Sequence, residues 1–484
     1  MIKLPIDPRR ELWRWGPIKL KVLYMAYFME DIWHGVPKCY QWPWPPIIFI
    51  FNRGYGVGMM DYRALKAVGD KYFRRYFLNP KNFARHWVRY ESWISDYESF
   101  ADQVNALKLR ELSNQALAKL YHEFRQLNYD FWLIVHVPEM ANWGGEAMLL
   151  RALRQIDPLR AETHLEVLAA PTKPSFFQEE EMELLRLAAK TTRANLPEAL
   201  REHARRYAWI LNSYAGNRRL GPTYFLVKLR ELTRERSAAR VLQSIKIRLN
   251  AIAYRKRALA RQLRISPQVR RMAEMLGEAV FWHDDRKGYI WRLQHTGDPI
   301  LREIARRQGW NFEELLWCLP EEVARLALGH SLNKKDVLRR RGDYVMIYGQ
   351  RIGREHYGAA AKKICAMYKT KTTGQQEVKG LVVSRSLKLV RGTVRLVRDP
   401  LREVGKMWKG DILVAAMTSP EYIVVMRKAA AIVTDHGGMT SHAAVVSREL
   451  GVPCIVNTKH ATSVFKDGDL VEVDTKNSIV RKLS

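Results

Sequence analysis

Apolar residues recur at three- and four-residue spacing among charged residues over the chain from about 61 to 341. This spacing places them on one face of a helix, and it predicts helices over residues 98–129, 179–189 and 224–262. Ser175 and Gln178 predict a capping box at the start of the second of these, while Pro267 and Pro320 mark further helix boundaries. The first sixty residues, rich in Trp, Pro and Tyr, predict irregular structure with short helices, and the glycine cluster at 54–60 predicts a turn.

The pattern changes near residue 369. Residues 369–379 are polar without apolar periodicity, which is typical of a linker, and about eleven extended residues reach roughly 35–40 Å. Short β-rich runs follow at 378–383, 392–397, 411–416 and 430–435, and later at 453–457 and 470–473, before a final strand. Ser419 and Pro420 predict one helix, and residues 441–450 predict another that ends at Gly451.

These patterns predict a multidomain α+β fold. A large, mostly α-helical N-terminal region precedes a compact β/β/α domain of about a hundred residues, an ordinary domain size. We expect a mostly helical subdomain over 1–170, a second helical subdomain over 171–368, the linker over 369–379 and the compact domain over 380–484.

Composition narrows the class of protein. Apolar content of 47% favours a folded chain, and the four cysteines are too far apart in sequence to predict a metal or redox pair. Charged residues throughout the N-terminus, with no long apolar run, favour a cytoplasmic protein without a membrane span.

The formal net charge is +31, of which residues 379–484 supply +7 (17 Lys and Arg against 10 Asp and Glu). The remaining +24 lies in the first 378 residues and favours an anionic partner. Residues 224–271 predict one long helix with Arg or Lys in nearly every turn. We favour a solvated or protein-docked face for it over a nucleic-acid surface, because no nucleic-acid motif accompanies it.

The segment TDHGGMTSHAAVVSRELGVP, residues 434–453, joins a predicted buried strand to a helix. Gly437 and Gly438 permit a tight turn, and Thr440 and Ser441 stand where the helix begins. Free backbone N–H groups and the positive end of the helix dipole favour an anion there. His442 lies in the first turn, where a neutral imidazole nitrogen is a nucleophile near pH 7. On these residues alone, a helix start with an N-capping Thr and an incidental histidine is the favoured interpretation.

The same segment closely resembles the phosphohistidine signature of the phosphoenolpyruvate-utilizing enzymes, a family that includes pyruvate phosphate dikinase, phosphoenolpyruvate synthase and rifampicin phosphotransferase. The resemblance implies a swivelling domain in which His442 carries a phosphoryl group. It also implies that the residues around His442 hold the phosphate, namely Gly437, Gly438, Thr440 and Ser441. Arg448 and His436 are supporting candidates, and no metal site is expected.

The family's ATP-grasp domain and its phosphoenolpyruvate/pyruvate barrel have no counterpart that we recognise in this chain. We therefore expect no directly bound cofactor, with ATP and Mg supplied through a separate ATP-grasp protein that phosphorylates His442. By similarity to rifampicin phosphotransferase, the helical part would bind a small-molecule hydroxyl acceptor.

Two helical-part histidines, His136 and His283, are candidate acceptor-site bases, although a structural role is favoured for each. Tryptophans could line an acceptor pocket, but core packing is the favoured interpretation (Trp87, Trp93, Trp132, Trp143, Trp209 and Trp282). Two further hypotheses stay open: a phosphoenolpyruvate synthase-like component whose barrel is another chain, and a non-catalytic basic binding protein that retains the fold.

Overall fold

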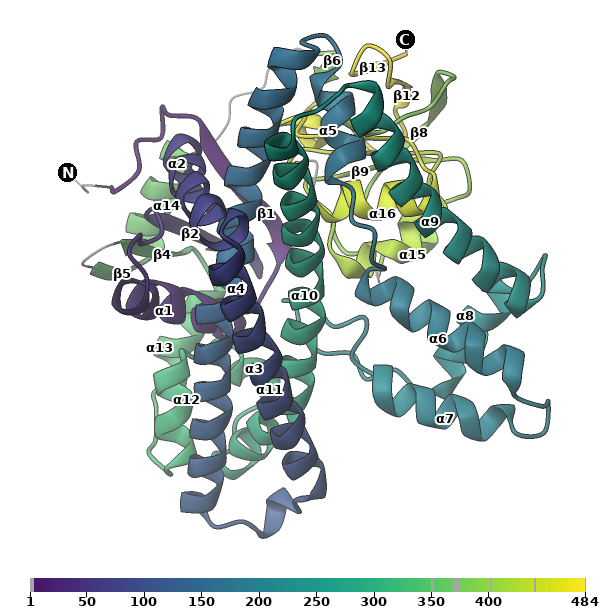
Figure 1. The fold of residues 1–484 in the computed structure, drawn as a ribbon. Coiled ribbons are helices and arrows are strands. Elements are labelled where there is room, and N and C mark those ends of the chain that lie inside the picture. Colours follow the sequence, from purple (N-terminus) through teal and green to yellow (C-terminus); the bar gives the residue numbers. More distant parts are fainter. Residues whose placement is uncertain (1–3, 350–351, 369–374, 401, 439–440, 484) are drawn as a thin grey trace. The chain divides into compact units, whose positions relative to one another are not determined.

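The computed structural model describes residues 4–349, 352–368, 375–400, 402–438 and 441–483. Contacts between residues group them into two units. Figure 1 shows the helices and strands, coloured along the sequence. Unit 1 contains Met1–Leu65, Ser213–Ala215 and Gln308–Ser484, and unit 2 contains Lys66–Asn212 and Gly216–Arg307. These units are not the segments predicted from the sequence, whose division at residues 170 and 368 stays a prediction.

Unit 2 is built around three long helices. These are α3 (Pro80–Ala106), α4 (Asn114–Ile156) and α10 (Pro267–Arg307), which lie side by side with α4 contacting both others (Figure 1). Helix α2 (Tyr62–Tyr72) begins in unit 1 and continues into this unit at Lys66. The other described elements of unit 2 are η1 (Phe73–Leu78), η2 (Leu109–Glu111), α5 (Ala161–Ala169), α6 (Phe176–Lys190), α7 (Leu196–Tyr207), α8 (Pro222–Leu232) and α9 (Ala238–Gln262).

The predicted helix starts are confirmed, whereas one of the predicted long helices is interrupted. Ser175 and Gln178 form the predicted capping box at the start of α6, and Pro267 begins α10. The helix predicted over 98–129 is wrong, because the chain leaves α3 after Ala106 and re-enters a helix at Asn114.

The single long helix predicted over 224–271 is also wrong. It is α8, α9 and the start of α10, separated by residues 233–237 and 263–266. At the second break Arg264 adopts φ +49°, a left-handed conformation that ends a helix. The spacing of apolar residues continues across this break, so a prediction from that spacing alone does not detect the left-handed residue that ends the helix.

The prediction of irregular structure for the first sixty residues is wrong. β1 (Leu12–Lys19), β2 (Ile47–Asn52) and β3 (Tyr55–Asp61) join β4 (Tyr344–Gly349) and β5 (Ile352–Tyr357) in an antiparallel sheet of order β1-β3-β2-β4-β5. Of the glycine turn predicted at 54–60, Gly54 lies in the turn between β2 and β3 with φ +82°, and residues 55–60 belong to strand β3. A Cβ at Gly56 or Gly58 would lie 2.6 Å from the Leu20 or Phe49 side chain, so these glycines make room for large neighbours across the strand.

Helices accompany this sheet in sequence. They are α1 (Val22–Cys39), α11 (Phe312–Leu315), α12 (Pro320–Ala327), α13 (Lys334–Leu338), η3 (Arg339–Arg341) and α14 (Gly358–Met367). Pro320 begins α12, as predicted. Of the predicted linker, residues 369–374 lie outside the described residues, and Glu377–Lys379 form strand β6.

The C-terminal region contains an eight-stranded sheet of order β6-β13-β12-β8-β9-β10-β11-β7. Its strands are β6, β7 (Leu381–Ser384), β8 (Val390–Leu396), β9 (Ile412–Ala415), β10 (Ala431–Thr434), β11 (Cys454–Val456), β12 (Leu470–Asp474) and β13 (Ile479–Lys482). Its short helices are η4 (Val404–Lys406), η5 (Pro420–Tyr422), α15 (Ile423–Met426), α16 (His442–Leu450) and α17 (Ala461–Val464). A large helical region followed by a sheet-rich C-terminal region is thus confirmed.

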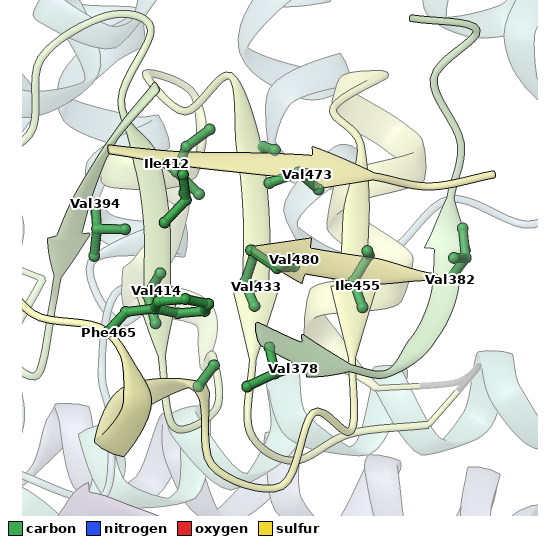
Figure 2. Packing of buried hydrophobic residues seen from close by; sticks show 13 residues of the cluster. Val378, Val382, Val394, Ile412, Val414, Val433, Ile455, Phe465, Val473 and Val480 are labelled. Carbon is green, nitrogen blue, oxygen red and sulfur yellow. The ribbon is translucent and has the colours of Figure 1, made fainter. Parts of the chain in front are cut away.

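β-branched side chains fill the core of this sheet. Val414, Val433 and Ile455 come from three neighbouring strands and are fully buried together with Val473 and Val480 (Figure 2). The four strands β8, β9, β10 and β11 are mutually parallel. Their carboxyl ends therefore share one edge, where loops from different strands meet.

No helix in the described part of the chain combines the length and the apolar content needed to cross a membrane. Of the four cysteines, Cys318 and Cys454 are buried and Cys39 is exposed.

Candidate active site

The loops that leave β9, β10 and β11 are tied together by their backbones at the shared edge. The His436 N–H donates to the Ala416 carbonyl at 2.9 Å, and the Thr458 N–H donates to the Thr434 carbonyl at 3.1 Å. The Thr434 hydroxyl also donates to the His436 carbonyl at 2.8 Å. These bonds fix the position of the segment that leads from β10 into α16.

His442 is the first residue of α16, and Ser441 is its N-cap. The Ser441 Oγ accepts from the Ala444 N–H at 3.4 Å, and the helix ends at Gly451 with φ +68°. The His442 side chain is buried, with 6% of its surface exposed. Since the N-terminal N–H groups and the helix dipole attract negative charge, a phosphoryl group on this imidazole would lie beside the favourable end of the helix.

The imidazole of His442 is held by a residue that the sequence analysis missed. Thr418 Oγ1 lies 2.9 Å from His442 Nδ1, and Thr418 itself is buried, with 4% of its surface exposed. Either atom can supply the proton. If Nδ1–H donates to the hydroxyl, the neutral ring keeps its lone pair on Nε2, which is the form that can attack phosphorus.

The signature glycines shape the turn before the helix. Gly437 has φ +139°, a region that only glycine occupies readily, and a Cβ there would lie 2.9 Å from Ser441 Oγ. The Gly438 carbonyl accepts from the Ser441 N–H at 3.1 Å. Thr440 lies outside the described residues, and the phosphate-binding roles of Gly437, Gly438, Thr440 and Ser441 stay predictions.

The two supporting candidates differ in environment. Burial lowers the pKa of His436 to about 4, so at neutral pH it offers a neutral ring rather than a cation. The Nε of Arg448 donates to the Val383 carbonyl at 2.9 Å, which links α16 to β7. This contact gives Arg448 a packing role in the described structure.

A second residue missed from the sequence is Asp435. Burial raises the pKa of its carboxyl to about 6, although hydrogen bonds from Thr462 favour the charged form. The Thr462 N–H donates to Asp435 Oδ1 at 2.9 Å, and the Thr462 hydroxyl bonds to Oδ2. Asp435 thereby joins the loop after β10 to α17.

Residues 407–478 match the family model described as PEP-utilising enzyme, mobile domain. This region carries a PEP-utilising mobile domain. The chain is 44% identical over 138 residues to a probable phosphoenolpyruvate synthase of Archaeoglobus fulgidus, and 56% identical over 80 residues to a phosphoenolpyruvate synthase of Pyrococcus furiosus. A third relative, a probable phosphoenolpyruvate synthase of Methanothermobacter thermautotrophicus, is 46% identical over 103 residues.

These similarities cover only part of each chain. The aligned segments cover 26%, 16% and 21% of this chain, in the same order, and 18%, 10% and 15% of the relatives. The chain therefore spans less than a fifth of the length of these relatives. What the relatives do as whole proteins comes to this chain only as a proposal.

Outside the mobile domain, both histidine candidates have polar partners within unit 2. His136 is 1% exposed, and its Nε2 lies 3.2 Å from the Tyr72 hydroxyl. Burial lowers its pKa well below the usual value. His283 Nε2 lies 3.1 Å from Glu139, and burial lowers the pKa of His283 to about 3.

In two carboxyl groups on α10, burial raises the pKa instead of lowering it. The Tyr90 hydroxyl donates to Asp285 at 2.8 Å, and burial raises the pKa of Asp285 to about 6. Burial also raises the pKa values of Asp284 and, on α6, Glu179. A buried carboxyl that titrates near neutrality is suited to accept a proton from a hydroxyl. The sequence signal for this group was the adjacent pair Asp284–Asp285.

The tryptophans of the helical unit pack against other aromatic rings. The Trp282 ring lies 4.9 Å from Trp87 and 5.0 Å from Tyr90 between centroids, and Trp282 is fully buried. Trp93 and Trp132 are also buried, at 3% and 4% exposure. This supports the core interpretation over a pocket lining. Over the described residues of both units, no group of three or more His, Cys, Asp and Glu side chains is arranged to hold a metal ion.

Proposed function

We propose that this chain is the phosphoryl-carrying component of a phosphotransferase, with His442 as the carrier. The observation that supports this most is the position of His442 at the start of α16 with its Nδ1 bonded to Thr418. This arrangement leaves Nε2 as the nucleophile and sets it beside an anion-attracting helix end.

In the first step, the Nε2 lone pair attacks phosphorus. The P–N bond forms, the bond between phosphorus and the leaving oxygen of the nucleotide breaks, and the ring becomes positively charged. Thr418 accepts the Nδ1–H of that ring, so its hydrogen bond strengthens as the charge develops. We propose that ATP and Mg reach His442 on a separate ATP-grasp protein.

In the second step, a hydroxyl oxygen of the acceptor attacks phosphorus, the P–N bond breaks, and the hydroxyl proton passes to a base. We propose that the helical unit binds this small-molecule acceptor. The group of carboxyls formed by Asp284, Asp285 and Glu179 has raised pKa values, which supports one of them as the base better than His136 or His283.

His442 is buried in this structure, so donor and acceptor reach it only after the side chain is uncovered. We propose that the mobile domain swivels, on the linker predicted from the sequence at 369–379, so that the histidine becomes accessible. A protein with such a motion would alternate between a protected and an accessible histidine.

A test uses the full chain, ATP labelled at the γ or the β phosphorus, and lysate of the source cells. We expect acid-labile, base-stable label on the wild type with lysate, and none on His442→Ala. His330→Ala, which changes an exposed histidine outside the mobile domain, is the matched control and should label like the wild type. Equal labelling of His442→Ala and the wild type would refute the proposal, and so would no label on any chain under any condition.

The relatives favour a second candidate, a phosphoenolpyruvate synthase-like reaction in which the acceptor is pyruvate. Adding pyruvate to the labelled chain separates the two. Release of label as phosphoenolpyruvate supports this candidate, whereas label that stays on the chain until another hydroxyl compound is added supports the first.

A further inference from the structure

A cavity of about 490 Å³ lies in unit 2 between α9, the start of α10 and the α5–α6 connection. The helices α9 and α10 are joined by the short turn at 263–266. The Ile265 N–H donates to the Ala260 carbonyl at 3.2 Å and closes the end of α9. Ile265 is buried and lines the cavity. The volume is in the range of sites that bind small ligands.

Positive charge converges on this cavity from three elements. Lys173 belongs to the α5–α6 connection, Lys256, Arg257 and Arg261 to α9, and Arg270 to α10. Only two acidic residues line the same space, and both are glutamates of α10, Glu274 and Glu278. With five cations against two anions, the lining carries a net charge of +3.

Two of the cations are already engaged. Lys173 Nζ lies 2.8 Å from Glu278, and Lys256 Nζ donates to the Ala170 carbonyl at 2.7 Å. The lowered pKa of Lys256, about 8, reflects its burial. These contacts hold the two lysines within the protein's own hydrogen-bond network.

The three arginines differ from the lysines. Within the described ranges, no carboxylate lies at ion-pair distance from Arg257, Arg261 or Arg270. Arg257 and Arg261 are one turn apart on α9, where like charges repel and destabilise a helix. An anion bound between the three side chains would relieve this repulsion and accept forked hydrogen bonds.

Apolar side chains form the rest of the lining. Leu168, Ala260 and Phe281 contribute to it, and the Phe281 ring centroid lies 4.6 Å from Lys173 Nζ. A bare inorganic anion would leave this apolar surface uncovered. The combination matches a ligand with one charged end and one apolar end.

We propose that this cavity binds a small organic phosphate. The phosphate lies between Arg257, Arg261 and Arg270, and the organic group packs on the apolar lining near Phe281. A concave site with apolar walls fits a small molecule better than a nucleic-acid strand, which needs an extended charged track. The site does not depend on phosphorylation of His442.

The test measures binding of phenyl phosphate and of inorganic phosphate to the full chain by calorimetry at fixed ionic strength. We expect phenyl phosphate to bind the wild type more tightly than inorganic phosphate does. The triple variant Arg257→Gln, Arg261→Gln, Arg270→Gln should weaken phenyl phosphate binding at least about tenfold. The matched triple variant Arg240→Gln, Arg248→Gln, Arg255→Gln removes the same charge from exposed positions of α9 and should change binding by less than about twofold.

Four results would overturn the proposal. They are no binding of phenyl phosphate to the wild type, equal binding of the two probes, equal weakening by the two triple variants, and binding of single-stranded RNA in place of phenyl phosphate. Both triple variants should still be phosphorylated on His442, so a failure here is distinguishable from a failure of the proposed function.

Discussion

The hydrogen bond between Thr418 and His442 gives the most specific prediction. Thr418→Val replaces the hydroxyl by a methyl group of similar size and leaves the buried Nδ1 of His442 without its 2.9 Å contact to that hydroxyl. Removing one partner of a buried hydrogen bond costs ~1–3 kcal/mol. The ring becomes positively charged as the P–N bond forms, and the hydrogen bond to Thr418 is stronger for the charged ring. Losing it therefore raises the activation free energy of phosphorylation by this amount, which slows the reaction by roughly five- to 150-fold.

A chemical donor makes the assay independent of any partner protein. Phosphoramidate phosphorylates accessible histidines in water, and the rate can be followed by intact mass for the wild type, Thr418→Val and Thr418→Ser. Thr418→Ser keeps the hydroxyl and should stay within about threefold of the wild type. Equal rates for the wild type and Thr418→Val would refute the role of this bond, and so would an equal loss in both variants. Circular dichroism checks that each variant is folded.

Three further predictions concern stability. Gly437→Ala places a side chain at φ +139° with its Cβ 2.9 Å from Ser441 Oγ, so it should destabilise the start of α16 by ~1–3 kcal/mol, measured by hydrogen exchange of the α16 amides. Because burial raises the pKa of Asp435 to about 6, the folded state binds this proton more tightly than the unfolded state. Its contribution to stability therefore falls as pH rises from about 4 to about 6, by ~3 kcal/mol in total, and urea unfolding of Asp435→Asn should lack this decrease. Glu180→Gln should destabilise unit 2 by ~1–3 kcal/mol, because it removes a fully buried carboxylate that pairs with Lys228 and His203 and leaves Glu181, 3.6 Å from the Lys228 ammonium, as the counter-charge of that lysine. The exposed Glu202→Gln should cost ~0–1 kcal/mol in the same thermal unfolding assay.

The parts of the fold that could be predicted from the sequence depend on contacts between near neighbours. Ser175 and Gln178 are three residues apart, and their capping box appears as predicted. The same holds for Gly451, which ends α16 in a left-handed conformation. Each of these features is decided within one or two helical turns, so the local sequence contains the whole signal.

The N-terminal sheet could not be predicted in this way. Strand β2 pairs with β4, whose residues follow almost three hundred positions later, and strand β3 carries glycines that interrupt the apolar alternation. Those glycines are explained only by the Leu20 and Phe49 side chains that lie against them. The pattern of residues along one segment does not show which distant strand pairs with it or which side chains pack against its glycines.

Only the part of the candidate site that is contiguous in sequence could be predicted. His442, Ser441 and the glycines are consecutive or nearly so, and all of them belong to the one signature segment. Thr418 lies 24 residues earlier in the chain, on the loop after β9. The parallel pairing of β9 with β10 brings the two loops to one edge of the sheet. A polar residue just after a predicted parallel strand was the available signal, and it becomes specific only once the strand order is known.

The central claim is that His442 carries a phosphoryl group. The most direct measurement is a proton–phosphorus NMR correlation on the full chain after exposure to phosphoramidate. The account predicts coupling of phosphorus to the imidazole protons of His442 in a pattern that identifies Nε2, and loss of that signal in His442→Ala. An unmodified His442 in a folded chain whose other histidines become phosphorylated would contradict the account.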